Sequence, residues 1–487
     1  MRFRGARLRI IGGAAAIPAM VVLLTASTSG SSTSARSTAP PSSATGVPSV
    51  SSPTASASDG DGSSGTSLSY HGSSTLTGAV PAGASLDHAT KSWSVDLGGV
   101  VHGQPVAADG RVVAATERNR VIALDPRDGR VQWSRTLGAP LTNVAAVAGC
   151  GNIDPLGITS TPVIDAATHT VYVVGEVSIG HGAVRHVLTG LSLSTGRTVL
   201  SEDVDPVLPA GETATNLLQR VSLAIANGRI YVGYGGNDGD CGSYHGWIVG
   251  VREAGAPDLK SFEVAADGEG GAIWESGGGI AVDGSGDLYV TTGNANPDPP
   301  QGGPDPKRYT ESVVKLSPEL TPLASFKDRI AGGDEDLSTS NPVLLPDGLL
   351  FAVGKTDVGF VLRQDDLSQV TAITGVCGSD PGGGPAYDAA TDRIFVPCRG
   401  GGIQEVDLGT RSLGPRLSGA DSSPTLIGRD LWALDYPSGT VTEWDARTRA
   451  RLQRIETGEQ VANFATPASA FGLLLIPTET GVTAFSG

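Results

Sequence analysis

The chain has 487 residues, including 68 Gly and 31 Pro, and only 17% of its residues are charged. Because Gly in a helix interior costs about 1 kcal/mol relative to Ala, this composition disfavours long helices and favours a turn-rich, all-β fold. The net charge of −16 repels phosphate backbones and anionic lipid surfaces, so we expect no nucleic acid partner.

Residues 1–29 have the layout of a secretory signal peptide. Four arginines precede an apolar run from Ile10 to Ala26, which is interrupted by Gly and Pro and is short for a membrane span. We predict a signal peptide cleaved near Ala26 or Ser27, and an uncleaved N-terminal membrane anchor is the alternative. Both place the rest of the chain outside the cytoplasm, either secreted or tethered to the outer face of the cytoplasmic membrane, with no other membrane contact.

Residues 30–91 consist mainly of Ser, Thr, Ala, Gly and Pro. A segment with so few large apolar side chains cannot bury enough surface to fold by itself. We therefore predict a disordered linker over residues 30–91 and a single folded domain over residues 92–487.

The folded domain repeats one pattern, in which a short apolar strand, a turn and a second apolar strand follow a small or Pro-containing start. Its copies begin at residues 103, 160, 219, 276, 339, 382, 421 and 463. The eight copies have a period of about 49 residues, which suits a four-stranded propeller blade. We therefore predict an all-β, eight-bladed β-propeller of four-stranded antiparallel blades, and we expect it to be a monomer.

The two ends of this domain complement each other. The last copy stops after its third strand, "GVTAFSG", and residues 91–98, "KSWSVDLG", could supply its missing outer strand. In that arrangement Trp93 corresponds to Trp133, the tryptophan of the outer strand in the first copy. Joining the N- and C-terminal strands in one blade would close the ring and remove an exposed sheet edge.

The stretch "RVIALDPRDGRVQW" at residues 120–133 resembles the pyrroloquinoline quinone (PQQ)-like repeat of quinoprotein dehydrogenases and BamB-type assembly factors. The resemblance extends over essentially all of residues 92–487. Within this family, the chain resembles a group of bacterial exported proteins that contain such repeats. It implies the propeller fold. For the enzymes it also implies an axial quinone with a stacking Trp, a calcium ion and a catalytic Asp.

Trp247, Trp274 and Glu275 are the nearest candidates by residue type for that cofactor site, but none of them matches the motif of the enzymes. The sequence also lacks the adjacent Cys pair of many alcohol-oxidising members and a CxxCH haem motif. We therefore favour blade-packing roles for the tryptophans and predict no catalytic residue. Only the family resemblance implies PQQ and Ca²⁺ as cofactors.

Two Gly/Asp-rich segments, residues 235–247 and 331–338, are predicted loops in which a ligand could be bound. His245 in the first of them is a candidate for lining a ligand cleft. Lys355 is a candidate for facing the axis, where we expect it to form an ion pair. The histidine spacing matches no zinc motif, so no metal site is predicted.

Four cysteines in an exported protein predict disulfides, with three possible connectivities. Cys377 and Cys398 flank a loop followed by a strand and could close that section. Cys150 and Cys241 would then form the second pair.

These patterns predict a non-catalytic binding or scaffold module whose ligand is a protein or a small molecule. One alternative is a PQQ-dependent dehydrogenase of alcohols or sugars, and another is a BamB-like envelope assembly factor. A fold of this kind hosts several functions, so the repeat identifies the architecture better than the activity.

Overall fold

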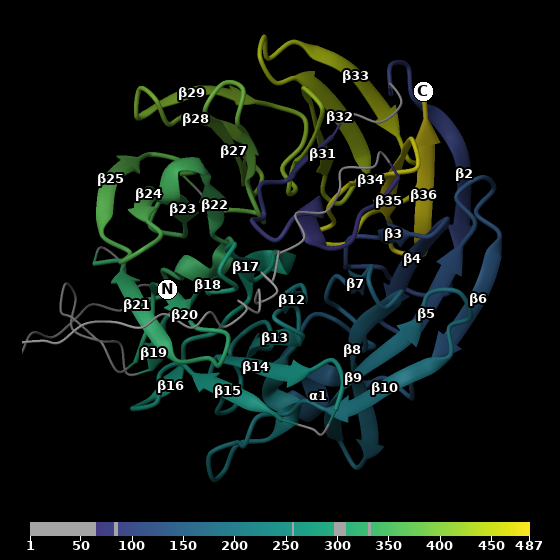
Figure 1. The fold of residues 1–487 in the computed structure, drawn as a ribbon, viewed down its shortest axis with the longest axis vertical. Coiled ribbons are helices and arrows are strands. Elements are labelled where there is room, and N and C mark those ends of the chain that lie inside the picture. The colour runs from purple at the N-terminus through teal and green to yellow at the C-terminus, as the bar shows by residue number, and fades with distance from the viewer. Residues whose placement is uncertain (1–64, 82–85, 256–257, 297–307, 330–332, 379) are drawn as a thin grey trace, which may run out of the picture. The chain divides into compact units, whose positions relative to one another are not determined.

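The computed structural model describes residues 65–81, 86–255, 258–296, 308–329, 333–378 and 380–487. The predicted signal peptide or anchor, residues 1–29, and residues 30–64 of the predicted linker lie outside the described residues. The described residues form eight antiparallel sheets around a common axis (Figure 1). The prediction of an all-β, eight-bladed propeller is therefore confirmed.

Each blade consists of four strands, which follow one another from the axis outward. Blades 1 to 3 consist of β3 (Val106–Ala108), β4 (Arg111–Thr116), β5 (Arg120–Leu124) and β6 (Val131–Thr136); β7 (Val163–Asp165), β8 (Thr170–Gly180), β9 (Ala183–Ser192) and β10 (Thr198–Asp203); and β12 (Ala224–Ala226), β13 (Arg229–Gly236), β14 (Trp247–Arg252) and β15 (Lys260–Glu263). Blades 4 to 6 consist of β17 (Ala281–Val282), β18 (Leu288–Thr291), β20 (Ser312–Leu316) and β21 (Pro322–Lys327); β22 (Val343–Leu345), β23 (Leu349–Val353), β24 (Val358–Arg363) and β25 (Gln369–Thr374); and β26 (Ala386–Asp388), β27 (Arg393–Cys398), β28 (Gly402–Asp407) and β29 (Ser412–Leu417). Blade 7 consists of β30 (Thr425–Ile427), β31 (Asp430–Asp435), β32 (Thr440–Asp445) and β33 (Arg451–Glu456), and blade 8 of β34 (Ala468–Ala470), β35 (Leu473–Pro477), β36 (Gly481–Ser486) and β2 (Thr90–Asp96).

The remaining elements are short. They are β1 (Ala79–Val80), β11 (Leu217–Leu218), β16 (Glu269–Gly270), β19 (Ala295–Asn296), the helix α1 (Val144–Ala148) and 3-10 turns at Tyr70–Gly72, Ala214–Asn216, Glu275–Gly277, Leu337–Thr339 and Pro346–Gly348.

The ring closes as the sequence predicts. The N-terminal strand β2 pairs antiparallel with the C-terminal strand β36, from Thr90 opposite Ser486 to Asp96 opposite Gly481. Segments from the two ends of the described chain therefore lie side by side in blade 8 (Figure 1). This pairing covers the edge of β36 that would otherwise be left without a neighbouring strand.

The outer-strand tryptophans join neighbouring blades. Trp93 of blade 8 donates its indole N–H to the Pro126 carbonyl at 2.9 Å and packs on Gly129, the turn glycine of blade 1. Trp133 of blade 1 packs in the same way on Gly196, the turn glycine of blade 2. A Cβ atom at either glycine would lie within 3 Å of the indole carbons, and both glycines have positive φ. The turn therefore needs Gly both for its conformation and for contact with the tryptophan.

The structure corrects the predicted boundary of the linker, because residues 65–81 belong to the propeller. We call them the axial segment, which is purple in Figure 1. Its backbone carbonyls accept hydrogen bonds of 2.7–3.0 Å from the innermost strands of six blades, donated by Ala107, Ile164, Val282, Leu344, Tyr387 and Leu426. Strand β1 also pairs with β30 as a fifth strand of blade 7. Innermost strands expose N–H groups toward the axis, and the axial segment supplies the acceptors that these groups need.

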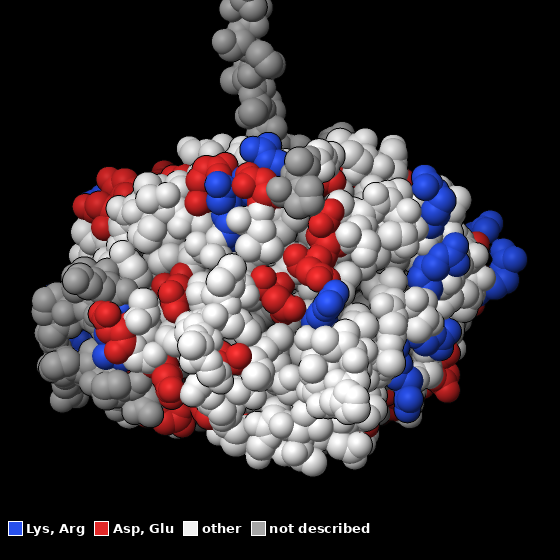
Figure 2. Space-filling model, turned by 90° about the horizontal axis from the view of Figure 1, so that it is seen from below, with Lys and Arg blue, Asp and Glu red and all other residues white. Residues whose placement is uncertain are grey.

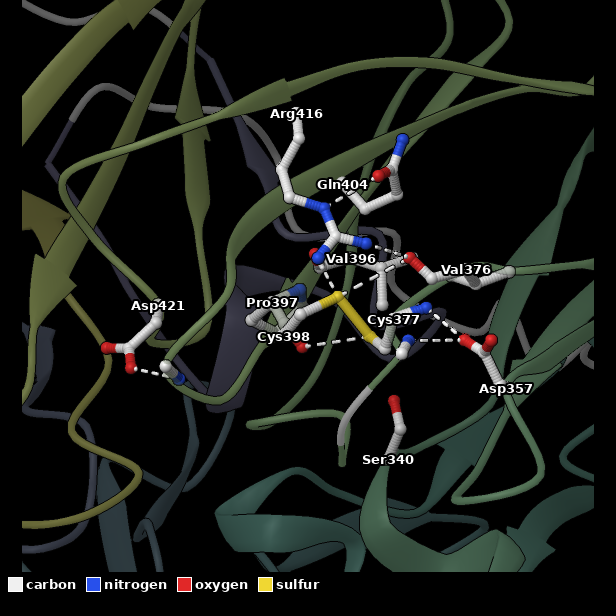
Figure 3. The surroundings of a disulfide bond; sticks show 12 residues. Ser340, Asp357, Val376, Cys377, Val396, Pro397, Cys398, Gln404, Arg416 and Asp421 are labelled. Carbon is white, nitrogen blue, oxygen red and sulfur yellow. Dashed lines mark hydrogen bonds between the residues drawn. A yellow bond between two sulfur atoms is a disulfide. The ribbon is translucent and has the colours of Figure 1, made fainter.

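The disulfides are those that the cysteine positions suggested. Cys377 and Cys398 join the loop after β25 to the end of β27, and Cys150 and Cys241 join the loop after α1 to the loop between β13 and β14. Around the first disulfide, the Asp357 carboxylate accepts the N–H groups of Cys377 and Gly378, and Arg416 donates to the Val376 carbonyl at 3.0 Å (Figure 3). Side chains from blade 5 and blade 6 thus hold this connection in place.

The surface carries both charge signs, which are unevenly distributed. Figure 2 shows acidic side chains spread over much of one side of the propeller, with Lys and Arg gathered toward its right edge. Over the described part of the chain, no helix has the length and apolar character needed to cross a membrane.

Candidate ligand-binding pocket

A pocket of about 830 Å³ opens at one end of the propeller axis. Two kinds of loop line it: those that lead into the innermost strand of a blade, and those that join its second and third strands. Loops of all eight blades contribute. The axial segment occupies the channel between the innermost strands, so the pocket is a cup with one open end rather than a tunnel.

Two of the predicted candidates line this pocket. Trp274 donates its indole N–H to the Gly236 carbonyl at 2.8 Å and forms part of the wall. Lys355 forms the expected ion pair, because its Nζ lies 2.7 Å from Asp334 and 2.9 Å from Asp336. The two Gly/Asp-rich loops also reach the pocket.

The other three candidates lie elsewhere. Glu275 is fully buried behind the lining, and its Oε1 accepts the Thr291 N–H at 2.9 Å. Burial raises the pKa of Glu275 well above its usual value. His245 pairs with Glu212 through its Nδ1 at 2.6 Å, outside the pocket lining. Trp247 packs in the core between blades 2 and 3.

A histidine and a glutamate that the sequence analysis did not single out meet in the pocket wall. His102 Nε2 lies 3.7 Å from Glu117 Oε1, and Glu117 Oε2 accepts the Gly157 N–H at 2.7 Å. Burial, with a contribution from the charge of Glu176, raises the pKa of Glu117 to about 8. Burial also lowers the pKa of His102 to about 4. At neutral pH both groups are therefore mainly uncharged, and their contact is polar rather than ionic.

Two arginines and a phenylalanine from distant parts of the chain also meet in the pocket. The guanidinium carbons of Arg220 and Arg399 lie 4.4 and 5.3 Å from the centre of the Phe464 ring. Phe464 has a positive φ of 67°, a backbone conformation that side chains of this size rarely adopt. Burial and the nearby charge of Arg399 lower the pKa of Arg220 to about 10.

Comparison with known proteins agrees with this fold. The family model described as outer membrane protein assembly factor BamB matches residues 84–255. Quinohemoprotein alcohol dehydrogenase from Comamonas testosteroni superposes with a TM-score of 0.67 at 13% identity, over 86% of this chain and 80% of its own. The described chain has the eight-bladed propeller fold of these proteins, and residues 84–255 match the PQQ-like repeat model.

Other solved structures share the same propeller. A europium-containing methanol dehydrogenase gives a TM-score of 0.67 at 12% identity, over 87% of this chain and 98% of its own. BamB from Moraxella catarrhalis gives 0.55 at 13% identity, over 82% of this chain and 100% of its own. No curated protein matches the sequence significantly. At these identities the similarity establishes the fold of the PQQ-like propeller and leaves its function to be argued from the site.

The pocket of this PQQ-like propeller does not fit the calcium–quinone pair. Calcium takes six to eight oxygen ligands, including several carboxylates. Within the part of the chain that the structure describes, no group of three or more His, Cys, Asp or Glu side chains is arranged to hold a metal ion. Trp274 offers its indole edge to the backbone of Gly235 and Gly236 as part of the wall. We therefore derive no chemistry through this cofactor.

The repeat pattern contains a signal that indicates some of the pocket residues that the sequence analysis did not single out. His102, Arg220 and Phe464 each lie within one residue of a repeat start, at 103, 219 and 463. The starts mark loops that lead into innermost strands, and residues at or near several of them, including Ser276 and Thr339, line the pocket. Reading the starts as a ring of pocket positions would have brought these three residues together.

The buried Glu117 predicts a pH dependence of stability. Its folded pKa of about 8 exceeds the unfolded value of 4.5, so the folded protein holds a proton that the unfolded chain loses. The contribution of Glu117 to stability is therefore full below about pH 4.5 and is lost as the pH rises to about 8. We expect Glu117→Gln, which still accepts the Gly157 N–H, to be more stable than wild type at pH 8 by about 2–4 kcal/mol.

The measurement is the unfolding midpoint of both proteins from pH 5 to pH 8. The difference between them should grow with pH in favour of the variant. A difference that stays constant over this range would mean that Glu117 is ionised in the folded protein.

Proposed function

We propose that this propeller is a non-catalytic binding module that acts outside the cytoplasmic membrane and holds a small-molecule ligand in its axial pocket. The observation that carries the proposal is the convergence of loops from all eight blades on one cup of about 830 Å³. This volume is typical of ligand pockets, and such pockets occur at the mouths of closed β structures. The two disulfides support a location outside the cytoplasm.

The ionisable groups of the pocket support binding rather than catalysis. Lys355 is held by two aspartates, and the His102–Glu117 contact joins two groups that are mainly uncharged at neutral pH. Neither arrangement provides an activated nucleophile or an ionised base. The pocket instead offers a fixed set of polar and aromatic walls.

A pair of matched variants tests whether the pocket binds a ligand. Asp238 is exposed and lines the pocket, whereas Asp128 is exposed in the turn between β5 and β6, away from it. Asp238→Trp should fill the mouth of the pocket, and Asp128→Trp makes the same change of charge and bulk elsewhere. In a thermal-shift screen of small metabolites, we expect at least one compound to stabilise wild type and Asp128→Trp but not Asp238→Trp.

Failure of every compound, or equal stabilisation of both variants, would overturn the proposal. Two further assays decide the alternatives. Dye-linked oxidation of alcohols or sugars after incubation with PQQ and Ca²⁺, with a quinone absorbance retained through gel filtration, would show a dehydrogenase instead. Recovery of outer-membrane insertion machinery with the tagged protein would show an envelope assembly role.

A further inference from the structure

Arg220, Arg399 and Phe464 form a group in the pocket that is not explained by the packing of the blades. We call them the Arg–Phe–Arg group. They come from three separate loops, which precede β12, follow β27 and precede β34, and both guanidinium groups lie over the same aromatic ring. All three residues line the axial pocket. Two positive charges are therefore held close together at a surface that a ligand can reach.

No carboxylate of the described residues contacts Arg220 directly, although the charge of Asp238 acts on it from a distance. Among the described residues, no carboxylate oxygen lies within 4.0 Å of its nitrogens, and its Nε is buried without a hydrogen-bond partner. Lys355 in the same pocket shows the usual arrangement, with carboxylates at 2.7 and 2.9 Å. A guanidinium that is withdrawn from water and has no counter-charge in contact is costly, and a bound anion would lower that cost.

We propose that the Arg–Phe–Arg group binds the carboxylate of a small organic acid whose remainder is neutral or cationic. This inference rests on the proposed function, since it names the ligand class of the same pocket. Guanidinium groups present paired N–H donors that match the two oxygens of a carboxylate, and the face of Phe464 offers an apolar surface beside them. Phe464 has a positive φ, which is a strained backbone conformation for a side chain of this size, and its ring lies beside the two guanidinium groups.

The remaining charges of the pocket select against more highly charged anions. Asp96, Asp238 and Asp380 also line it, together with Glu479. Carboxylates around the mouth would repel a phosphate or a tricarboxylate and would tolerate or attract a cationic group on the ligand. A single carboxylate on an otherwise neutral or cationic molecule fits both sets of charges.

Ligand-observed NMR with simple probes tests the proposal on the full chain. The probes are benzoate, its neutral analogue benzamide, inorganic phosphate and citrate, each at millimolar concentration. We expect benzoate to bind wild type and the other three to bind more weakly. Arg220→Gln removes the charge and the paired donors, so it should weaken benzoate binding by about 10-fold or more.

The matched control is Arg197→Gln, because Arg197 is exposed in the turn between β9 and β10, away from the pocket. It makes the same change of net charge and should leave benzoate binding within about twofold of wild type. Arg220→Lys keeps the charge without the paired donors and should weaken binding by an intermediate factor. Arg399→Gln serves as the second variant should Arg220→Gln fail to fold.

The outcomes separate this inference from the function on which it rests. Equal binding of benzoate and benzamide, stronger binding of phosphate or citrate, or unchanged binding by both Gln variants of the group would overturn the carboxylate site. If neutral compounds then still distinguish Asp238→Trp from Asp128→Trp, the proposed binding function stands without it. Absence of binding by all four probes and by every compound of the screen overturns both.

Discussion

Replacing Tyr70 by Ala should lower the free energy of unfolding by about 3–5 kcal/mol, the usual cost of removing a buried aromatic ring. Tyr70 lies in the axial segment, is only 1% exposed and stacks on His71 with 4.1 Å between ring centres. The neighbouring carbonyls of the segment accept hydrogen bonds from six blades. Loss of the ring would therefore leave a cavity at the point where the blades meet. Urea unfolding followed by tryptophan fluorescence measures the effect.

Tyr70→Phe is the matched control, because it keeps the ring and removes only the hydroxyl group. We expect it to cost about 1 kcal/mol or less. If Tyr70→Ala were as mild as Tyr70→Phe, the axial segment would add little to the stability of the ring, and residues 65–81 would be better described as a peripheral strap.

Replacing Trp93 by Ala should also destabilise the protein by about 3–5 kcal/mol. Trp93 is 7% exposed, donates to the Pro126 carbonyl and packs on Gly129, so it holds blade 8 against blade 1 where the ring closes. The unfolding midpoint measures the stability. Limited proteolysis should show earlier cleavage of the chain that leads into β2.

Ser92→Ala is the control for this position, since Ser92 is the exposed neighbour of Trp93 on β2 and its hydroxyl donates to the Ser486 hydroxyl at the protein surface. Its effect should stay within about 0.5 kcal/mol. Similar losses in both variants would mean that the pairing of β2 with β36, rather than the contact between the two blades, closes the ring.

Much of the architecture was predictable because its signals are local. The eight repeat starts each lead into a short innermost strand, and the missing strand of the last copy matches the strand that contains Trp93. The pairing of Cys377 with Cys398 follows from their position around one loop and strand. The ion pair of Lys355 was also expected, because a lysine near a propeller axis needs a counter-charge.

The axial segment was not predictable from composition. It has few large apolar residues, among them Leu68, Tyr70 and Leu76, and the surrounding Ser, Thr and Gly make the average resemble a linker. Its order comes from backbone hydrogen bonds to strands that exist only once the ring has formed, together with the burial of Tyr70 and Leu76 between the blades. The composition of residues 65–81 does not show that their backbone carbonyls are the acceptors for N–H groups of distant strands.

The sequence by itself determined the number of blades and the way the ring closes, since these depend on periodic apolar strands, and it suggested the Cys377–Cys398 pair, which flanks one loop and strand. The structure decided among the disulfide connectivities, because Cys150 and Cys241 come from loops 91 residues apart.

Only the tertiary structure decided what the axis contains. Arg220, Arg399 and Phe464 belong to loops of three different blades, and the closure of the ring brings both arginines over the Phe464 ring. The environment of the Arg220 charge is a property of that convergence, because burial and the neighbouring charges of Arg399 and Asp238 act through space rather than along the chain.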